Sequence, residues 1–362
     1  MKLDKVQISH FRNIDDLSLV AHGSLNVFLG ENGSGKSSIL EALHYLGYAR
    51  SFRTHKHKNV ISHEKQGFTV FCSTVAENGK QQKFGISRLA NDSCIVNING
   101  QKSKRATDLA SNLPIQIFTP QSSDLLLGAP KLRRRYLDWV LFHVEQSFNL
   151  DFQVFNKSLK HLNALYKSHQ PDQSLSYWND LLCEKGEAIS LNRESLLNDH
   201  LIQLINANLK DFLPEFCFEI SYYRGWEKGY TLADSILKNR SRDQKYGFLS
   251  VGPHKADLRI KTQGVNAYEI LSRGQLRMLV AGMQLAQTQY LHAQTAKSSI
   301  FLLDDVGAEL DEEKRKVFIS RLNTSDTQLF VTAIDIKQLE FLENYTDKKV
   351  FHVEHGQVRE EI

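Results

Sequence analysis

The chain has 362 residues, of which 41% are hydrophobic and 24% are charged, and its formal net charge at pH 7 is +4. This composition is typical of a soluble globular protein with two or three domains. No run approaches the roughly 20 apolar residues of a membrane span, and the start, MKLDKVQISHF, lacks the apolar core of a secretion signal, so we expect a cytoplasmic protein with no membrane partner.

The four cysteines are far apart in the sequence and form no C-x-x-C pair. This spacing argues against a zinc site and against a disulfide framework. The slightly positive net charge permits a nucleic-acid partner without requiring one, so local clusters of charge carry more information than the total.

The first predicted elements are two strands and a helix. Residues 2–9 alternate apolar and polar side chains, which predicts a strand with one face on the core, and this strand leads into Phe11-Arg12-Asn13. Leu25–Leu29 is an apolar run readable as a buried strand. Apolar residues from Ile39 to Leu46 then recur at helical spacing.

Between that strand and that helix, Gly30–Ser37 reads GENGSGKS and fits the phosphate-loop template G-x-x-x-x-G-K-[ST] at every fixed position. Its three glycines let backbone N–H groups point at phosphate oxygens. Lys36 would add a positive charge near the β- and γ-phosphates, and Ser37 a hydroxyl ligand for Mg²⁺. The template names a ligand but not a task, because many classes of ATPase and GTPase share it.

Residues 49–58, ARSFRTHKHK, form a basic run just after this helix. The run is either a solvated loop or a surface that contacts a polyanion. Residues 67–101 then read as two β-hairpins, with turns at Asn78-Gly79 and Asn99-Gly100, because Asn-Gly suits the positive φ angles of tight turns. We therefore expect an antiparallel β layer beside the phosphate-loop core.

A basic cluster at residues 131–135 stands at the start of a long region with helical spacing, which continues to about residue 213. The preceding Pro-rich segment delivers Gln121 to a loop. Apolar stripes in this region favour helix packing over a ligand site. The region is long enough for an antiparallel helical lobe and too short for a long coiled-coil arm. A β-rich stretch follows, and then VGPHKADLRI at 251–260, whose ionisable residues suit either a surface turn or a site.

Two further segments would complete a nucleotide site. Ser272 and Gln275 form a capping-box pattern, which predicts a helix beginning at Ser272, and Gly274 leaves room for a phosphate near its first turn. Residues 300–303 form an apolar strand that ends in Asp304 and Asp305. The first acid could hold Mg²⁺ and the second could orient or deprotonate water, although paired acids at a strand end can also be turn formers.

The order FRN, GENGSGKS, LSRGQ, LLDD and ELD resembles that of the ABC-type ATPases of the chromosome-maintenance and DNA-repair branch. The resemblance is closest to the RecF family and covers essentially the whole chain, including FTPQSSDLLLGAPKLRRRYLDW and GPHKADLRI. It implies an α/β fold, an ABC-type P-loop ATPase head with an antiparallel β layer and an inserted helical lobe. The expected ATPase subdomain is 1–120 with 250–362, and the lobe is 121–249, adjoined by LSRGQ at 271–275.

The resemblance also implies the roles of individual residues, with ATP and Mg²⁺ as cofactors. The catalytic residues would be Asp305, Asp304 and Lys36, and the magnesium ligands Ser37 and Asp304. A homodimer would share its sites, each completed in trans by Ser272, Arg273, Gly274 and Gln275, with Asp311 in the D-loop. Nucleotide would contact Gly30, Glu31, Asn32, Gly33, Ser34, Gly35, Lys36, Ser37, Ser38, Arg12 and Gln121, whereas DNA would contact Arg50, Arg53, Lys56 and Lys58, or Lys131, Arg133, Arg134 and Arg135.

The implied function is an ATP-induced homodimer that clamps double-stranded and single-stranded DNA at gaps. With RecR and RecO it would direct RecA loading and support replication restart and the SOS response. The sequence departs from many relatives at Asp305, where glutamate is common, so we expect slow, DNA-dependent hydrolysis. Many ABC proteins carry a histidine that senses the γ-phosphate at the position of VTAID, residues 331–335. This sequence has none there, so Thr332 or Asp335 would substitute.

Two other functions remain open at the level of sequence. The nucleotide-binding subunit of an ABC transporter would share the ATP chemistry but would be indifferent to DNA. A structural clamp similar to the chromosome-maintenance proteins would bind ATP and DNA with negligible hydrolysis.

Overall fold

The computed structural model describes residues 2–75, 79–103, 106–168, 173–305, 312–324, 326–335, 339 and 347–361. The chain divides into two compact units, Met1–Ser122 with Ala281–Ile362, and Ser123–Val280. This division puts residues 250–280 in the second unit, whereas the sequence-based limits put them in the first.

An antiparallel sheet of the first unit has the strand order β2-β1-β4-β5-β6-β7. The strands are β1 (Lys2–Phe11), β2 (Ile14–Val20), β4 (Gly67–Val75), β5 (Gln81–Leu89), β6 (Cys94–Ile98) and β7 (Gln101–Ser103). Asn99 and Gly100 both have positive φ and close the β6–β7 hairpin, as their sequence predicts. The expected antiparallel layer is confirmed; the turn residue Asn78 lies outside the described residues.

The other sheet of this unit has the order β15-β14-β3-β13-β12-β8 and is parallel except for its terminal strand, β15. Its strands are β3 (Leu25–Leu29), β8 (Ile115–Phe118), β12 (Ile300–Leu303), β13 (Gln328–Ala333), β14 (Lys348–Glu354) and β15 (Gln357–Glu361). β3, β12 and β13 are buried along their whole length, as is usual for central parallel strands. The carboxyl ends of β3 and β12 therefore open on the same edge of the sheet.

Helix α1 (Lys36–Tyr48) begins directly after the phosphate loop, as predicted, and is buried on almost every side. Its apolar side chains join one core with side chains of both sheets, so the helix is packed between them. Aromatic rings of β1, α1 and β4 meet edge to face there, at Phe11, Tyr45 and Phe68. The unit also contains a 3-10 turn (His57–Val60), the short helix α2 (Ala106–Ala110) and the longer helix α12 (Glu312–Thr324).

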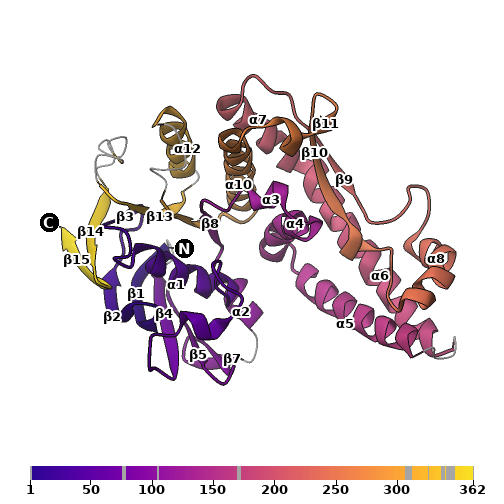
Figure 1. Ribbon diagram of the computed structural model, residues 1–362, viewed down its shortest axis with the longest axis horizontal. Helices are drawn as coiled ribbons and strands as arrows, with labels where there is room; N and C mark the ends of the chain where they lie inside the picture. The colour runs from indigo at the N-terminus through magenta and orange to yellow at the C-terminus, as the bar shows by residue number, and fades with distance from the viewer. Residues whose placement is uncertain are drawn as a thin grey trace. The chain divides into compact units, whose positions relative to one another are not determined.

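The second unit is mostly helical (Figure 1). Its helices are α3 (Asp124–Leu127), α4 (Pro130–Val144), α5 (Phe148–Lys167), α6 (Gln173–Leu196), a π-helical segment (Leu197–Leu201), α7 (Ile202–Phe212), α8 (Leu232–Tyr246) and α9 (Ala267–Ile270). A small antiparallel sheet has the order β11-β10-β9, from Val265–Asn266, Asp257–Thr262 and Glu219–Tyr223. The expected combination of an α/β head, an antiparallel layer and a helical lobe is thus confirmed.

Helix α10 (Arg273–Thr295) begins in the second unit and ends in the first. Within the first unit its buried Gln287 accepts a hydrogen bond from Gln116 of β8. Among the described residues, no helix combines the length and apolarity needed to cross a membrane.

Candidate functional site

The phosphate loop connects β3 to α1 and depends on its glycines. Gly30, Gly33 and Gly35 have φ angles of +155°, +83° and +120°, a region that side chains disfavour. A Cβ atom on Gly30 would also lie 2.3 Å from the backbone oxygen of Val353 in β14. The loop can therefore adopt these angles and pass close to β14 only with glycine at these positions.

Asn13, in the turn between β1 and β2, holds the loop from the other side. Its Nδ2 donates to the Ser34 carbonyl over 3.3 Å, and Ser38 donates through Oγ to Asn13 Oδ1 over 2.8 Å. The backbone N–H of Gly356, in the closing β14–β15 turn, donates to the same Ser34 carbonyl over 2.7 Å. Sequence analysis gave Asn13 no role, although it follows Arg12 directly.

Lys36 lies inside the loop and bonds to its backbone. Nζ donates to the carbonyls of Gly30 and Glu31 over 2.6 and 2.7 Å. Burial lowers the Lys36 pKa, whereas the charges of Asp305 and Asp304 oppose that shift. The buried Ser34 Oγ has no hydrogen-bond partner among the described residues. A buried cation and an unsatisfied hydroxyl in a glycine-rich loop fit a phosphate group.

Ser37, Asp304 and Thr332 meet where β3, β12 and β13 end. Ser37 donates through Oγ to Asp304 Oδ1 over 2.8 Å, and Thr332 Oγ1 donates to the same oxygen over 3.0 Å. Burial raises the pKa of Asp304, and these two hydrogen bonds oppose the shift. Oxygen ligands of this kind suit Mg²⁺. No group of three or more His, Cys, Asp and Glu gathers within the described part of the chain, so the ion would also need phosphate and water oxygens.

Thr332 also holds the second acid. Its Oγ1 accepts a hydrogen bond from the backbone N–H of Asp305 over 2.9 Å, and Asp305 has a positive φ of 54°. An aspartate tolerates this left-handed conformation better than most residues. The Thr332 hydroxyl therefore contacts both acids, the side chain of Asp304 and the backbone of Asp305. That Thr332 replaces a histidine stays a prediction.

Replacing Thr332 with valine is expected to reduce ATP hydrolysis about tenfold, since a valine leaves the Asp305 N–H unpaired and one bond to Asp304 unmade, at about 1–2 kcal/mol. Nucleotide affinity should change less than threefold, because the Thr332 hydroxyl is already hydrogen-bonded to both acids. Single-turnover hydrolysis and equilibrium nucleotide binding would separate the two effects. A Thr332→Ser variant, which keeps the hydroxyl, should retain most of the hydrolysis.

A cleft of 520 Å³ adjoins the loop, and two arginines line it. Arg12 donates through Nε and Nη2 to the fully buried Glu41 over 3.0 and 2.8 Å. The Arg53 guanidinium lies 3.8 Å from the same carboxylate and is about half exposed. The cleft therefore gathers three cations, Lys36, Arg12 and Arg53, together with Asp304 and Asp305. The resemblance implies Arg12 at the nucleotide, but it implies Arg53 only at DNA.

The remaining residues expected to contact nucleotide or DNA differ in whether they line this cleft. Gln121 is exposed and does not line it, and Asp311 lies outside the described residues. Arg50, Lys56 and Lys58 are exposed on the loop after α1, as a DNA-contacting surface would require. Asn32, Gly33, Gly35, Ser37 and Ser38 line the cleft together with Lys36.

The LSRGQ segment caps α10 as predicted. The Ser272 N–H donates to Gln275 Oε1 over 2.9 Å, and the Gln275 N–H donates to Ser272 Oγ over 3.3 Å. Ser272 is exposed and Gln275 is partly buried, and a Cβ atom on Gly274 would meet no heavy atom within 4 Å. The first turn of this helix is therefore open to an anion from another molecule.

The basic residues at 131–135 differ in exposure and in their hydrogen-bond partners. Lys131 is exposed, whereas Arg133 forms a two-pronged ion pair with Asp257 over 2.7 and 3.2 Å and also donates to the Gly128 carbonyl. Arg134 donates to the Ala256 carbonyl over 2.6 Å. Arg133 is thus committed to holding β10 against α4, which leaves it no free donor edge for a phosphate backbone.

Comparison with known proteins gives a consistent result at the level of family. The family model described as the RecF/RecN/SMC N terminal domain matches residues 2–359. The DNA replication and repair protein RecF of Pseudoalteromonas atlantica is 58% identical over 364 residues, which cover 100% of each chain. The corresponding protein of Psychromonas ingrahamii is 36% identical and covers 99% of each chain.

Solved structures agree with the fold. The structure of "the recombination mediator protein RecF-ATPrS in RecFOR pathway" has a TM-score of 0.87 and 25% identity, and the match covers 99% of this chain and 98% of that one. The SmcHead bound to the C-winged helix domain of ScpA has a TM-score of 0.60 and 13% identity, with 100% of this chain and 97% of that one covered, which is a likeness of fold alone.

Proposed function

Because this chain belongs to the RecF branch of the RecF/RecN/SMC N-terminal domain family, we propose that it is an ATP-controlled DNA-binding protein of DNA replication and repair. The observation that carries the proposal is the cleft itself. The phosphate loop, the Ser37–Asp304 pair and two arginines line one 520 Å³ space that holds charges of both signs. That arrangement suits a nucleoside triphosphate with a divalent cation.

ATP would give Lys36 phosphate oxygens in exchange for the two loop carbonyls that it contacts. Ser37 and Asp304 would hold Mg²⁺, which neutralises charge on the β- and γ-phosphate oxygens. Asp305 would orient or deprotonate the attacking water. Its side chain is shorter than that of glutamate, and its backbone is held by Thr332, so it should hold the attacking water less closely. We therefore expect slow hydrolysis, which suits a switch.

The exposed cap of α10 fits a role across a dimer. Ser272 and Gly274 of one protomer would contact the γ-phosphate held by Lys36 of its partner. ATP would then favour the closed dimer and hydrolysis the open form, since a ligand shifts an equilibrium only by its differential affinity for the two states. DNA binding would follow the closed state.

The partners proposed for the closed dimer are double-stranded and single-stranded DNA at gaps, together with RecR, RecO and RecA. The support is the resemblance to relatives named for DNA replication and repair, and to a solved structure described as part of the RecFOR pathway. Contact with DNA would be mainly through phosphates, with affinity that falls steeply as salt rises.

Sedimentation of the purified protein with ATP and Mg²⁺, with and without a short duplex, tests the proposal. We expect a monomer with ADP, a dimer with ATP, and tighter duplex binding by the dimer. A protein that binds ATP, stays monomeric and ignores DNA would favour a transporter-type subunit instead. Dimerisation and DNA binding without any hydrolysis would favour the structural clamp.

Substitution of Arg53 should affect ATP binding, whereas substitution of Lys56 and Lys58 on the same loop should affect duplex binding. Arg53→Gln removes a cation from the cleft, so ATP affinity should fall about tenfold, since one charge-assisted contact is worth about 1.5 kcal/mol. The double variant Lys56→Gln and Lys58→Gln should keep ATP affinity but lower duplex affinity and its salt dependence. Nucleotide binding and duplex titrations at two salt concentrations measure both. Equal effects of the two changes on ATP would contradict this assignment.

A further inference from the structure

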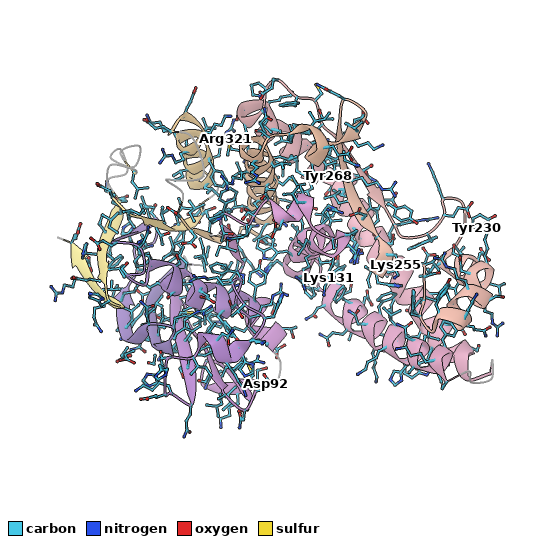
Figure 2. The ribbon with its side chains drawn as sticks, in the orientation of Figure 1. Asp92, Lys131, Tyr230, Lys255, Tyr268 and Arg321 are labelled. Atoms are coloured by element: carbon cyan, nitrogen blue, oxygen red, sulfur yellow. The ribbon has the colours of Figure 1, made fainter. Side chains whose placement is uncertain are left out.

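A second, smaller cavity of 200 Å³ lies wholly within the second unit. We call it the lobe pocket and define it by Lys131 and Arg134 of α4, Phe152 and Phe155 of α5, Ile189 of α6, and His254 of the GPHKAD turn. Figure 2 labels Lys131 on α4 and Lys255 beside the lower end of β10, next in sequence to His254. The proposed nucleotide chemistry uses none of these residues.

Hydrogen bonds fix the walls of the lobe pocket. Arg193 of α6, only 2% exposed, makes a two-pronged ion pair with Asp138 of α4 over 2.8 and 3.0 Å. The same guanidinium donates to the Pro253 carbonyl over 2.8 Å. The GPHKAD turn is therefore tied to both helices. This ion pair also neutralises Asp138, the carboxylate that lines the cavity.

The rim of the pocket carries two cationic side chains. Within the described part of the chain, Lys131 forms no ion pair, and Arg134 makes one hydrogen bond, to the Ala256 carbonyl. Burial, and then the charge of Arg193, lowers the Arg134 pKa, and the charges of Asp138 and Asp257 oppose that shift. The other donors of this half-buried guanidinium have no hydrogen-bond partner among the described residues, so a bound anion would add charge-assisted hydrogen bonds to it.

The floor of the pocket is apolar, and the ring of His254 borders it. Phe155 and Ile189 are fully buried core residues, and Phe152 lies beside them. His254 pairs through Nε2 with the Leu249 carbonyl over 3.0 Å, which requires the N–H on that nitrogen. Its buried Nδ1 is thus an acceptor, and it has no partner among the described residues. Burial lowers the His254 pKa to about 4, so the ring is neutral at pH 7.

These features select the chemistry of the ligand. A phosphate of the DNA backbone would satisfy the cationic rim but would leave the aromatic and aliphatic floor unfilled. A main-chain carboxylate with an apolar side chain on the adjacent Cα satisfies both. The cavity is large enough for one such residue and not for a longer folded segment.

We propose that the lobe pocket binds the C-terminal residue of a partner protein, an apolar residue with a free carboxylate at the end of an acidic tail. The carboxylate pairs with Arg134 and Lys131, the side chain enters the space between Phe152, Phe155 and Ile189, and acidic residues upstream lie outside the cavity near the exposed Lys131. This recognition resembles other pockets that capture a chain terminus by its charge and its last side chain.

The test is fluorescence anisotropy on the full-length protein, with a labelled octapeptide of glycine, serine and aspartate that ends in leucine. We expect saturable binding, and at least tenfold weaker binding of the same peptide with a C-terminal amide or with serine as its last residue. Arg134→Gln and Lys131→Gln should each weaken binding of the free-carboxylate peptide about tenfold. Lys131 is exposed, so its variant should fold even if Arg134→Gln does not.

Lys160→Gln is the matched control, because Lys160 is an exposed lysine of α5 that does not line the pocket. It should leave peptide binding unchanged. Equal affinity for the amide and the free acid, or an equal loss with Lys160→Gln, would overturn the proposal in favour of general charge attraction. If the unaltered protein binds no peptide and Lys131→Gln lowers duplex affinity, the proposal is wrong and Lys131 contacts DNA instead.

Discussion

Replacement of Lys36 with methionine is expected to abolish both ATP-dependent dimerisation and hydrolysis. Methionine has a similar length and no charge, so it removes the only cation that lies inside the loop among the described residues. Two charge-assisted contacts to phosphate, at about 1.5 kcal/mol each, correspond to roughly a 100-fold loss of ATP affinity. Sedimentation with ATP and Mg²⁺, beside a nucleotide titration, measures the two effects in the same preparation.

The control for this variant is Lys56→Met, which removes an exposed lysine from the neighbouring loop. It should dimerise with ATP like the unaltered protein and lose only part of its duplex affinity. A Lys36→Met protein that still dimerises with ATP would show that the interface closes without the phosphate loop, and the coupling of nucleotide to DNA proposed above would then be wrong.

The sequence predicts the phosphate loop and its neighbours well because their geometry is local. The glycines of GENGSGKS, the reciprocal cap of Ser272 and Gln275, and the Asn99-Gly100 turn each depend on backbone angles or on bonds three residues apart. The buried strand that ends in Asp304 was predictable for a similar reason, since an apolar run followed by carboxylates marks a strand end at the sheet edge.

What the sequence could not supply is the tertiary pairing of charges. Arg133 and Lys131 look alike in a basic run. However, Arg133 forms an ion pair with Asp257, 124 residues away, whereas Lys131 is exposed. Arg53 is indistinguishable from other loop cations until the fold brings it near Glu41. Helix α8 was missed, although Thr231 and Asp234 form a capping box that could have predicted its start.

The shared-site model makes its strongest prediction for a mixture of two inactive variants. Ser272→Arg should bind ATP normally but fail to dimerise, because a long cation replaces the hydroxyl at the open cap of α10. The lost cap costs the helix only about 1 kcal/mol, so the variant should remain folded. Alone, this protein and Lys36→Met are each expected to be inactive in hydrolysis.

Mixed together, the two variants should recover activity. In a two-fold dimer each site takes its phosphate loop from one protomer and its cap from the other, so a mixed dimer has one site with both defects and one intact site. Half of randomly formed dimers would be mixed, with one working site in two, which gives up to about a quarter of the unaltered rate. Hydrolysis and sedimentation of the equimolar mixture measure this recovery. If each site were complete within one protomer, no mixture of the two proteins could exceed the activity of its parts.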